Sequence, residues 1–126
     1  MNVPQYRVLV SGSLSFDDYE LLRFTLDRLL AGRENVVVVT GGATGAESLG
    51  ERYANERGFG IKQFLADWQT YGRGAKLIRN TQMIEAADHA VFFWDGQSKG
   101  TAEAVEKAEA RSIPVEVVRF DPRGTA

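Results

Sequence analysis

Val36-Val37-Val38-Val39-Thr40-Gly41-Gly42-Ala43-Thr44-Gly45-Ala46-Glu47 is the stretch that decides the fold. A run of β-branched residues ends in two adjacent glycines, a third glycine follows, and a helical pattern then begins. This order is typical of a buried parallel strand that passes into a helix through a turn with unusual backbone freedom. The turn and the helix start offer free N–H groups and the positive end of the helix dipole. The stretch therefore predicts a binding site for an anion such as phosphate.

The composition is that of one compact domain. The chain has 126 residues, 44% of them hydrophobic, so residues 1–126 are expected to form a single domain with its own core. There is no cysteine and only one histidine, His89, so neither thiolate chemistry nor a zinc site is predicted, and no metal or cofactor is expected. The formal net charge of −2 argues against duplex nucleic acid as a partner.

The hydropathy pattern gives no sign of a membrane segment. No apolar run approaches the ~20 residues that a membrane helix needs. The first residues also lack the basic and then apolar pattern of a secretory signal. A cytoplasmic protein without a membrane partner is therefore expected.

Strand and helix patterns alternate along the chain. Apolar runs predict strands at residues 7–11, 35–40, 61–64, 90–94 and 114–120. Helical spacing predicts helices from Asp17 or Asp18 to Gly32, from Ala46 to Gly58, and over residues 77–87 and 101–111. Residues 66–76 are expected to form a loop and residues 121–126 a frayed tail. This alternation predicts an α/β, Rossmann-like three-layer domain, with about five parallel strands and helices on both faces.

Small-residue turns follow three of the predicted strands. In an open parallel sheet, ligands bind at the carboxyl ends of the strands where the strand order reverses, so we expect the three turns to converge on one crevice. Their residues are Ser11, Gly12 and Ser13; Gly41, Gly42, Ala43, Thr44 and Gly45; and Ser98, Lys99, Gly100 and Thr101. The glycine spacing matches neither an ATPase P-loop nor a dinucleotide fingerprint. A tight strand-to-helix turn without a ligand stays the alternative for each of them.

Several polar side chains are candidates for contacts with a ligand. Arg79, with Asn80 beside it, stands at an expected helix start, where a guanidinium group can hold a phosphate with two hydrogen bonds. Lys99 lies at another expected helix start. Asp67 and Trp68 lie in the expected loop, where they would contact a ribose hydroxyl and cover a base. The alternatives are a surface ion pair for Arg79 and packing or a subunit contact for the loop residues.

Two carboxylates are candidates for acid–base catalysis. Glu47 and Glu103 are each expected in the first turn of a helix that follows one of the small-residue turns. Favourable interaction with the helix dipole explains such residues equally well. His89 has no evident catalytic companion in the sequence and is expected to be structural.

Taken in order, these motifs resemble the SLOG superfamily, which includes the LOG-type phosphoribohydrolases once described as lysine decarboxylases. Within it, the chain is most similar to the YspA or cpYpsA-related family. The resemblance covers nearly the whole chain. Its motifs are Gly12-Ser13 with Phe16 and Asp18-Tyr19, Gly41-Gly42-Ala43-Thr44-Gly45-Ala46, Arg52-Tyr53-Ala54, Ala66-Asp67-Trp68, Tyr71-Gly72, Arg79-Asn80 with Met83, and Ser98-Lys99-Gly100-Thr101.

The resemblance implies a Rossmann-like fold that binds nucleotides or their derivatives, and a homodimer or higher homo-oligomer. In LOG enzymes a Gly-Gly-x-Gly-Thr turn binds phosphate, and an arginine and a glutamate serve cleavage of the N-glycosidic bond. Gly100-Thr101 matches the end of that turn, and Arg79 and Glu103 are the nearest counterparts of the polar pair. Leu14 stands where the family usually has arginine, and Glu47 where it has aspartate. The Pro-Gly-Gly part of the turn is absent before Gly100. These departures favour binding over hydrolysis.

Three functions follow as hypotheses. The first is a sensor or sequestering protein that binds a nucleotide-derived ligand, such as an ADP-ribose-like or cyclic nucleotide signal. The second is a phosphoribohydrolase that cleaves the N-glycosidic bond of a nucleoside 5′-monophosphate, with Glu103, Glu47 and Arg79 as its catalytic residues. The third is a protein that assembles on single-stranded DNA, against which the acidic pI of about 5.4 argues.

Overall fold

The computed structural model describes residues 3–122, so residues 123–126 of the expected tail lie outside the described residues. Strands are β1 (Tyr6–Gly12), β2 (Val36–Thr40), β3 (Gly60–Gln63), β4 (His89–Trp94) and β5 (Val115–Arg119). Helices are α1 (Tyr19–Leu29), α2 (Ala46–Arg57), α3 (Trp68–Tyr71), the 3-10 turn η1 (Gly72–Gly74), α4 (Ala75–Ala86) and α5 (Lys99–Ala110). Within residues 3–122, no helix is both long enough and apolar enough to span a bilayer.

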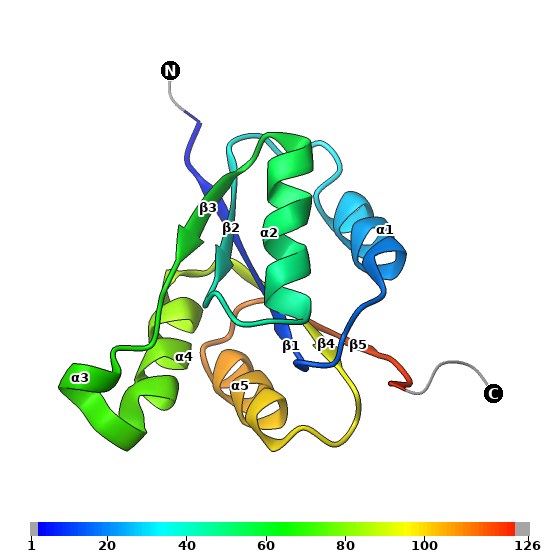
Figure 1. The fold of residues 1–126 in the computed structure, drawn as a ribbon. Helices are drawn as coiled ribbons and strands as arrows, with labels where there is room; N and C mark the ends of the chain where they lie inside the picture. Colours follow the sequence, from blue (N-terminus) through cyan, green and yellow to red (C-terminus); the bar gives the residue numbers. More distant parts are fainter. Residues whose placement is uncertain (1–2, 123–126) are drawn as a thin grey trace.

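The five strands form one parallel sheet in the order β3-β2-β1-β4-β5 (Figure 1). The predicted Rossmann-like arrangement is therefore confirmed. Leu9 at the centre of β1 is in register with Val39 of β2 and Ala90 of β4. Because the chain turns from β1 towards β2 but later returns to the other side of β1, the strand order reverses between β1 and β4. This is the position where open α/β sheets bind ligands.

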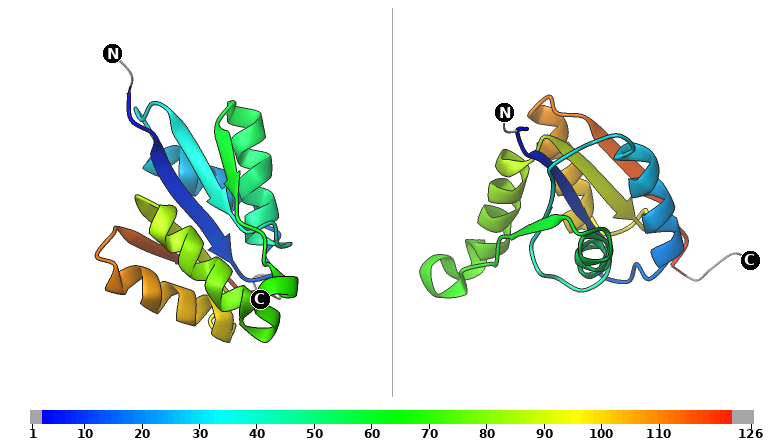
Figure 2. Two further views of the ribbon diagram at one scale, coloured as in Figure 1. Left: turned by 90° about the vertical axis from the view of Figure 1, so that its left-hand side faces the viewer. Right: turned by 90° about the horizontal axis from the view of Figure 1, so that it is seen from above.

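Helices cover both faces of the sheet (Figure 2). Side chains alternate along β1, so Val8 and Val10 pack into one core with helices α1 and α2, whereas Leu9 packs into a second core with α4 and α5. Both cores contain side chains with no exposed surface. The central strands are apolar on both faces because each face is covered, which is why their sequences are continuous β-branched and apolar runs.

Helix boundaries agree with the predicted caps at two places. The carboxylate of Asp18 accepts a hydrogen bond from the backbone N–H of Leu21, which caps α1. Gly58 has a left-handed conformation, with φ of 70°, and ends α2. Helix α1 ends at Leu29, earlier than the predicted stop at Gly32, and its last turn is closed by the N–H of Leu30.

The prediction of a loop over residues 66–76 is wrong, because this segment contains α3, η1 and the start of α4. Asp67 accepts a hydrogen bond from the N–H of Thr70 and starts the short helix α3. Gly72, with φ of 55°, ends α3, and α4 already begins at Ala75, which is buried. The sequence of this segment shows no apolar periodicity because α3 and η1 are exposed to solvent and have no buried residue. The α3 segment stands out from the body of the domain in Figures 1 and 2.

Candidate functional site

The three small-residue turns meet in one crevice at the carboxyl edge of the sheet. The turns after β1 and β4 form two of its walls, and the turn after β2 forms a third. The crevice has a volume of about 460 Å³. The predicted site residues that line it are Ser11, Gly12, Ser13, Ala43, Thr44, Glu47, Arg79, Asn80, Ser98, Gly100 and Thr101. Leu14, Lys76 and Ala104 complete the lining.

The other predicted site residues are not among those that line the crevice. Gly41, Gly42 and Gly45 belong to the turn after β2 but do not line the crevice. Asp67 caps α3, and the Trp68 side chain is exposed. Lys99 and Glu103 are also exposed. Thr101 and Ala104 lie on the face of α5 that borders the crevice. Glu103 lies between them in sequence, so helix geometry places it on a different face of α5, away from the crevice.

Glu47 is buried, with 4% of its surface exposed, and its carboxylate is fully engaged. Its Oε1 atom accepts hydrogen bonds from the backbone N–H groups of Gly41, at 2.9 Å, and Ala43, at 3.0 Å. Its Oε2 atom accepts one from the hydroxyl of Ser11, at 2.7 Å. The expected position in the first turn of a helix is correct, but the carboxylate turns back onto the glycine turn instead of facing a ligand. Glu47 thus joins the end of β1 to the turn after β2.

Arg79 lies in the second turn of α4 and not at the helix start as expected, since α4 begins four residues earlier. Its Nη1 atom donates to the carbonyl of Gly41 at 2.8 Å and lies 3.8 Å from Oε1 of Glu47. Its Nε atom donates to Oδ1 of Asn80. The Nη2 atom has no hydrogen-bond partner within residues 3–122. Every fully buried polar side-chain atom in these residues has a partner, so an atom without one, such as Nη2, must be in contact with solvent. The guanidinium group is held in place yet keeps donors for a ligand.

Two glycines are required by close approaches. A Cβ atom on Gly41 would lie 2.1 Å from Nη1 of Arg79, so the absence of a side chain makes room for the guanidinium group. A Cβ atom on Gly45 would lie 2.4 Å from the carbonyl oxygen of Ser13, and Gly45 also has φ of 78°. The glycines of this turn therefore bring three segments of the protein together, whereas the sequence alone suggested that they admit a ligand.

The start of α5 is aimed at the crevice by a polar turn. The carboxylate of Asp95 accepts hydrogen bonds from the backbone N–H groups of Ser98 and Gln97, and these bonds hold the pKa of Asp95 below its usual range. The hydroxyl of Ser13 contacts that of Ser98 at 3.1 Å. The first backbone hydrogen bond of α5 is donated by the N–H of Ala102 to the carbonyl of Ser98. The N–H groups before Ala102 therefore have no partner within the helix and can bind a ligand where α5 borders the crevice.

Lys76 also lines the crevice, although its sequence pattern did not mark it as a candidate. It lies on α4 one turn before Arg79 and Asn80, and all three line the crevice. Within residues 3–122 its ammonium group makes no ion pair. Lys76, Arg79 and Asn80 have the spacing i, i+3, i+4 and so share one face of a helix. A helix predicted to begin at Ala75 would have placed Lys76 beside the other two.

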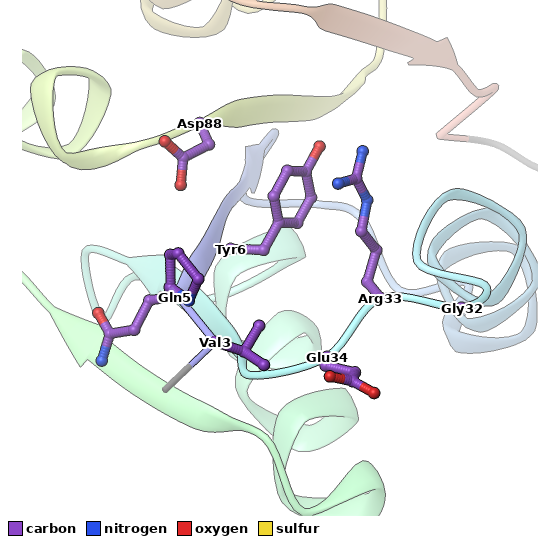
Figure 3. Close-up of a pocket in the computed structure, with 8 residues that line it drawn as sticks. Val3, Gln5, Tyr6, Gly32, Arg33, Glu34 and Asp88 are labelled. Carbon is purple, nitrogen blue, oxygen red and sulfur yellow. The ribbon is translucent and has the colours of Figure 1, made fainter. Parts of the chain in front are cut away.

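A second hollow lies at the opposite edge of the sheet (Figure 3). The guanidinium group of Arg33 stacks over the ring of Tyr6 at 4.0 Å, and the Tyr6 hydroxyl is 2.9 Å from Nδ1 of His89. Asp88 is already paired with Arg7. This hollow lies at the amino ends of the strands, away from the turns. Within residues 3–122, no group of acidic or histidine side chains is arranged to hold a metal ion.

The fold places the chain in the class of Rossmann-like α/β domains, with a crevice at the carboxyl ends of β1 and β4. Two solved structures share this fold, each with a TM-score of 0.64 over 89% of this chain. The X-ray structure of TM1055 is 24% identical, with 72% of that chain covered. DNA processing protein A from Helicobacter pylori, described for its single-stranded DNA binding mode, is 21% identical, with 64% of that chain covered. At these identities the likeness shows the fold alone.

The chain belongs to the YspA, cpYpsA-related SLOG family, whose model matches residues 6–71. It is also 36% identical to the Gene 61 protein of Mycobacterium phage D29 over 116 residues, which cover 86% of this chain and 93% of that protein. The resemblance stated from the motifs is thereby confirmed. The family match includes the glycine turn and Glu47 but ends before the cationic face of α4.

Proposed function

We propose that the crevice binds a nucleotide-derived small molecule through a phosphate group and that the protein acts as a sensor or sequestering protein. One observation carries this proposal. Lys76, whose ammonium group makes no ion pair within residues 3–122, borders a single cavity together with the N-terminal end of α5 and with Arg79, whose Nη2 atom has no partner in the same residues. Cations beside a helix N-terminus favour a phosphate. The volume of about 460 Å³ leaves room for a sugar and a base beside it.

The carboxylates favour binding over hydrolysis. Cleavage of an N-glycosidic bond needs a carboxylate that is free to activate water or to stabilise the charged sugar. Glu47 is the carboxylate among the lining residues, and its oxygens already accept three hydrogen bonds. Glu103 is exposed outside the crevice. Neither candidate is therefore presented to a ligand in a reactive position.

Calorimetric titration of the protein with AMP, cyclic AMP and ADP-ribose tests the proposal. We expect one of these ligands to bind and Lys76→Ala to weaken its binding by about 10- to 100-fold, because a charged hydrogen bond contributes about 1.5–3 kcal/mol. Lys107→Ala is the matched control, since Lys107 is a lysine on α5 outside the crevice. Equal effects of the two substitutions would rule out a phosphate contact of Lys76.

Chromatography of the same incubations separates binding from hydrolysis. We expect each nucleotide to be recovered intact. Release of free base by the wild-type protein, lost in Glu103→Gln, would instead establish the phosphoribohydrolase function and would contradict the role proposed for the crevice.

A second candidate function is binding of single-stranded DNA. Trp68 and Tyr71 are exposed on the α3 segment, and Arg73 and Lys76 follow within one or two turns. Exposed aromatic rings beside cations are a stacking surface for unpaired bases. Fluorescence anisotropy of a labelled oligonucleotide at increasing salt would detect such binding, and its loss in Trp68→Ala would favour this function.

A homodimer or higher homo-oligomer stays a prediction. Size-exclusion chromatography with light scattering measures it directly, and a mass of one chain at all concentrations would contradict it.

A further inference from the structure

The glycine turn after β2 contains a small anion cradle that the protein fills itself. The N–H groups of Gly41 and Ala43 converge on one point, and both donate to Oε1 of Glu47 at about 3 Å. Two backbone N–H groups that converge in a turn form a site that favours an anionic oxygen. The carboxylate of Glu47 therefore takes the position in which a phosphate oxygen would otherwise be bound.

The same carboxylate compensates the charge of Arg79. Its Oε1 atom is 3.8 Å from Nη1, and both side chains are more than nine-tenths buried. The lining residues thus carry two cations, Lys76 and Arg79, and one anion. The net charge offered to a ligand is about one positive charge, supplemented by the N–H groups at the start of α5.

We propose that Glu47 is a specificity-determining residue that limits the crevice to ligands with one phosphate group, such as a nucleoside monophosphate or a cyclic nucleotide. It does so by filling the cradle that would hold a second phosphate and by cancelling one of the two positive charges. The single phosphate then lies at the N-terminus of α5, beside Lys76. This inference rests on the proposed function of the crevice.

NMR titration of the ¹⁵N-labelled protein with inorganic phosphate and pyrophosphate tests this assignment. In the wild-type protein, phosphate should shift the amide signals of Gly100 and Thr101 and leave those of Gly41 and Ala43 unchanged. In Glu47→Ala, phosphate should shift both pairs, and the affinity for pyrophosphate should rise relative to phosphate by about tenfold, the effect of one added charged contact.

Glu51→Ala is the matched control. Glu51 lies on α2 one turn after Glu47 and accepts hydrogen bonds from Thr40 and Gln63, outside the crevice. The substitution changes the net charge by the same amount, so we expect it to leave the ratio of the two affinities unchanged. An equal rise in Glu47→Ala and Glu51→Ala would show a general charge effect and would overturn the inference.

Two further measurements keep the test decisive if Glu47→Ala is poorly folded. Glu47→Gln preserves the shape but removes the charge, so its relative affinity for pyrophosphate should also rise, and an unchanged ratio overturns the inference. Formate should restore the thermal midpoint and the phosphate preference of Glu47→Ala more than chloride at equal ionic strength.

The results also separate failure of the proposed function from failure of this inference. If phosphate and AMP shift no crevice amide in the wild-type protein, the proposed function fails. If the ligands bind but the preference is unaltered in both Glu47 variants, only the role of Glu47 is overturned.

Discussion

Gly41→Ala probes the packing of Arg79 against the glycine turn. The three heavy atoms nearest to an added Cβ atom all belong to the Arg79 side chain, at 2.1 to 2.8 Å. Gly41 does not have positive φ, so alanine is compatible with its backbone conformation. We therefore expect the main chain to stay in place while the guanidinium group moves away. The hydrogen bond from Nη1 to the Gly41 carbonyl is then lost.

The size of the effect follows from two opposing contributions. Loss of a charged hydrogen bond costs about 1.5–3 kcal/mol. Replacement of glycine by alanine reduces the entropy of the unfolded chain, which stabilises the folded state by about 0.4–1 kcal/mol. The free energy of unfolding should therefore fall by about 1–2 kcal/mol, which lowers the thermal midpoint of a domain of this size by about 4–8 °C. Because Arg79 no longer holds its position in the crevice, the affinity for the proposed phosphate ligand should fall about tenfold.

Urea denaturation and calorimetric titration measure the two effects, and a double-mutant cycle identifies their cause. In the Arg79→Ala background, Gly41→Ala should no longer destabilise the protein and should instead raise its stability by about 0.4–1 kcal/mol, because the clashing side chain is absent and only the effect on the unfolded chain remains. Gly60→Ala is a control, since its Cβ atom would meet only Val37, at 3.4 Å or more. Additive effects of the Gly41 and Arg79 substitutions, or unchanged affinity in Gly41→Ala, would refute the reasoning.

Three other predictions concern the core, the histidine and the surface. Leu22→Ala should cost about 2–5 kcal/mol in urea denaturation, because Leu22 is fully buried in the core beneath α1, and a cost below about 1 kcal/mol would contradict that packing. Burial lowers the pKa of His89, so stability should decline as the pH drops below about 6.5, where the unfolded chain takes up the proton first. NMR titration of this single imidazole should give a midpoint below that value, and a midpoint at or above it would show the opposite shift. Arg28→Ala should cost less than about 1 kcal/mol in thermal denaturation, because its ion pair with Glu116 is exposed to solvent, and a larger loss would indicate a structural role for the pair.

The sequence predicted the sheet and the convergence of the turns, because both depend on local patterns. The β-branched run at residues 36–39 marks a strand buried on both faces, and parallel strands place their carboxyl ends at one edge. The sequence did not predict the helices within residues 66–76. Their residues are exposed, so no apolar periodicity marks them, and the cation Lys76 was missed with them.

The roles of the two glutamates were decided only by the tertiary structure. Each occupies the first or second turn of a helix that follows a small-residue turn, and in sequence the two are equivalent candidates. Folding places Glu47 beneath the glycine turn, within hydrogen-bond distance of Ser11 from another strand, and leaves Glu103 on the exposed side of α5.

By itself, the sequence determined that a strand ends in a flexible turn at Gly41-Gly42 and that an anion can be held there. The tertiary structure decided that the carboxylate of Glu47 occupies that turn, and it brought Lys76, Arg79 and the start of α5 together around the crevice in which we propose that a phosphate binds. The physical reason is that turn chemistry is local, whereas the rotation of each helix against the sheet sets which side chains reach the turn.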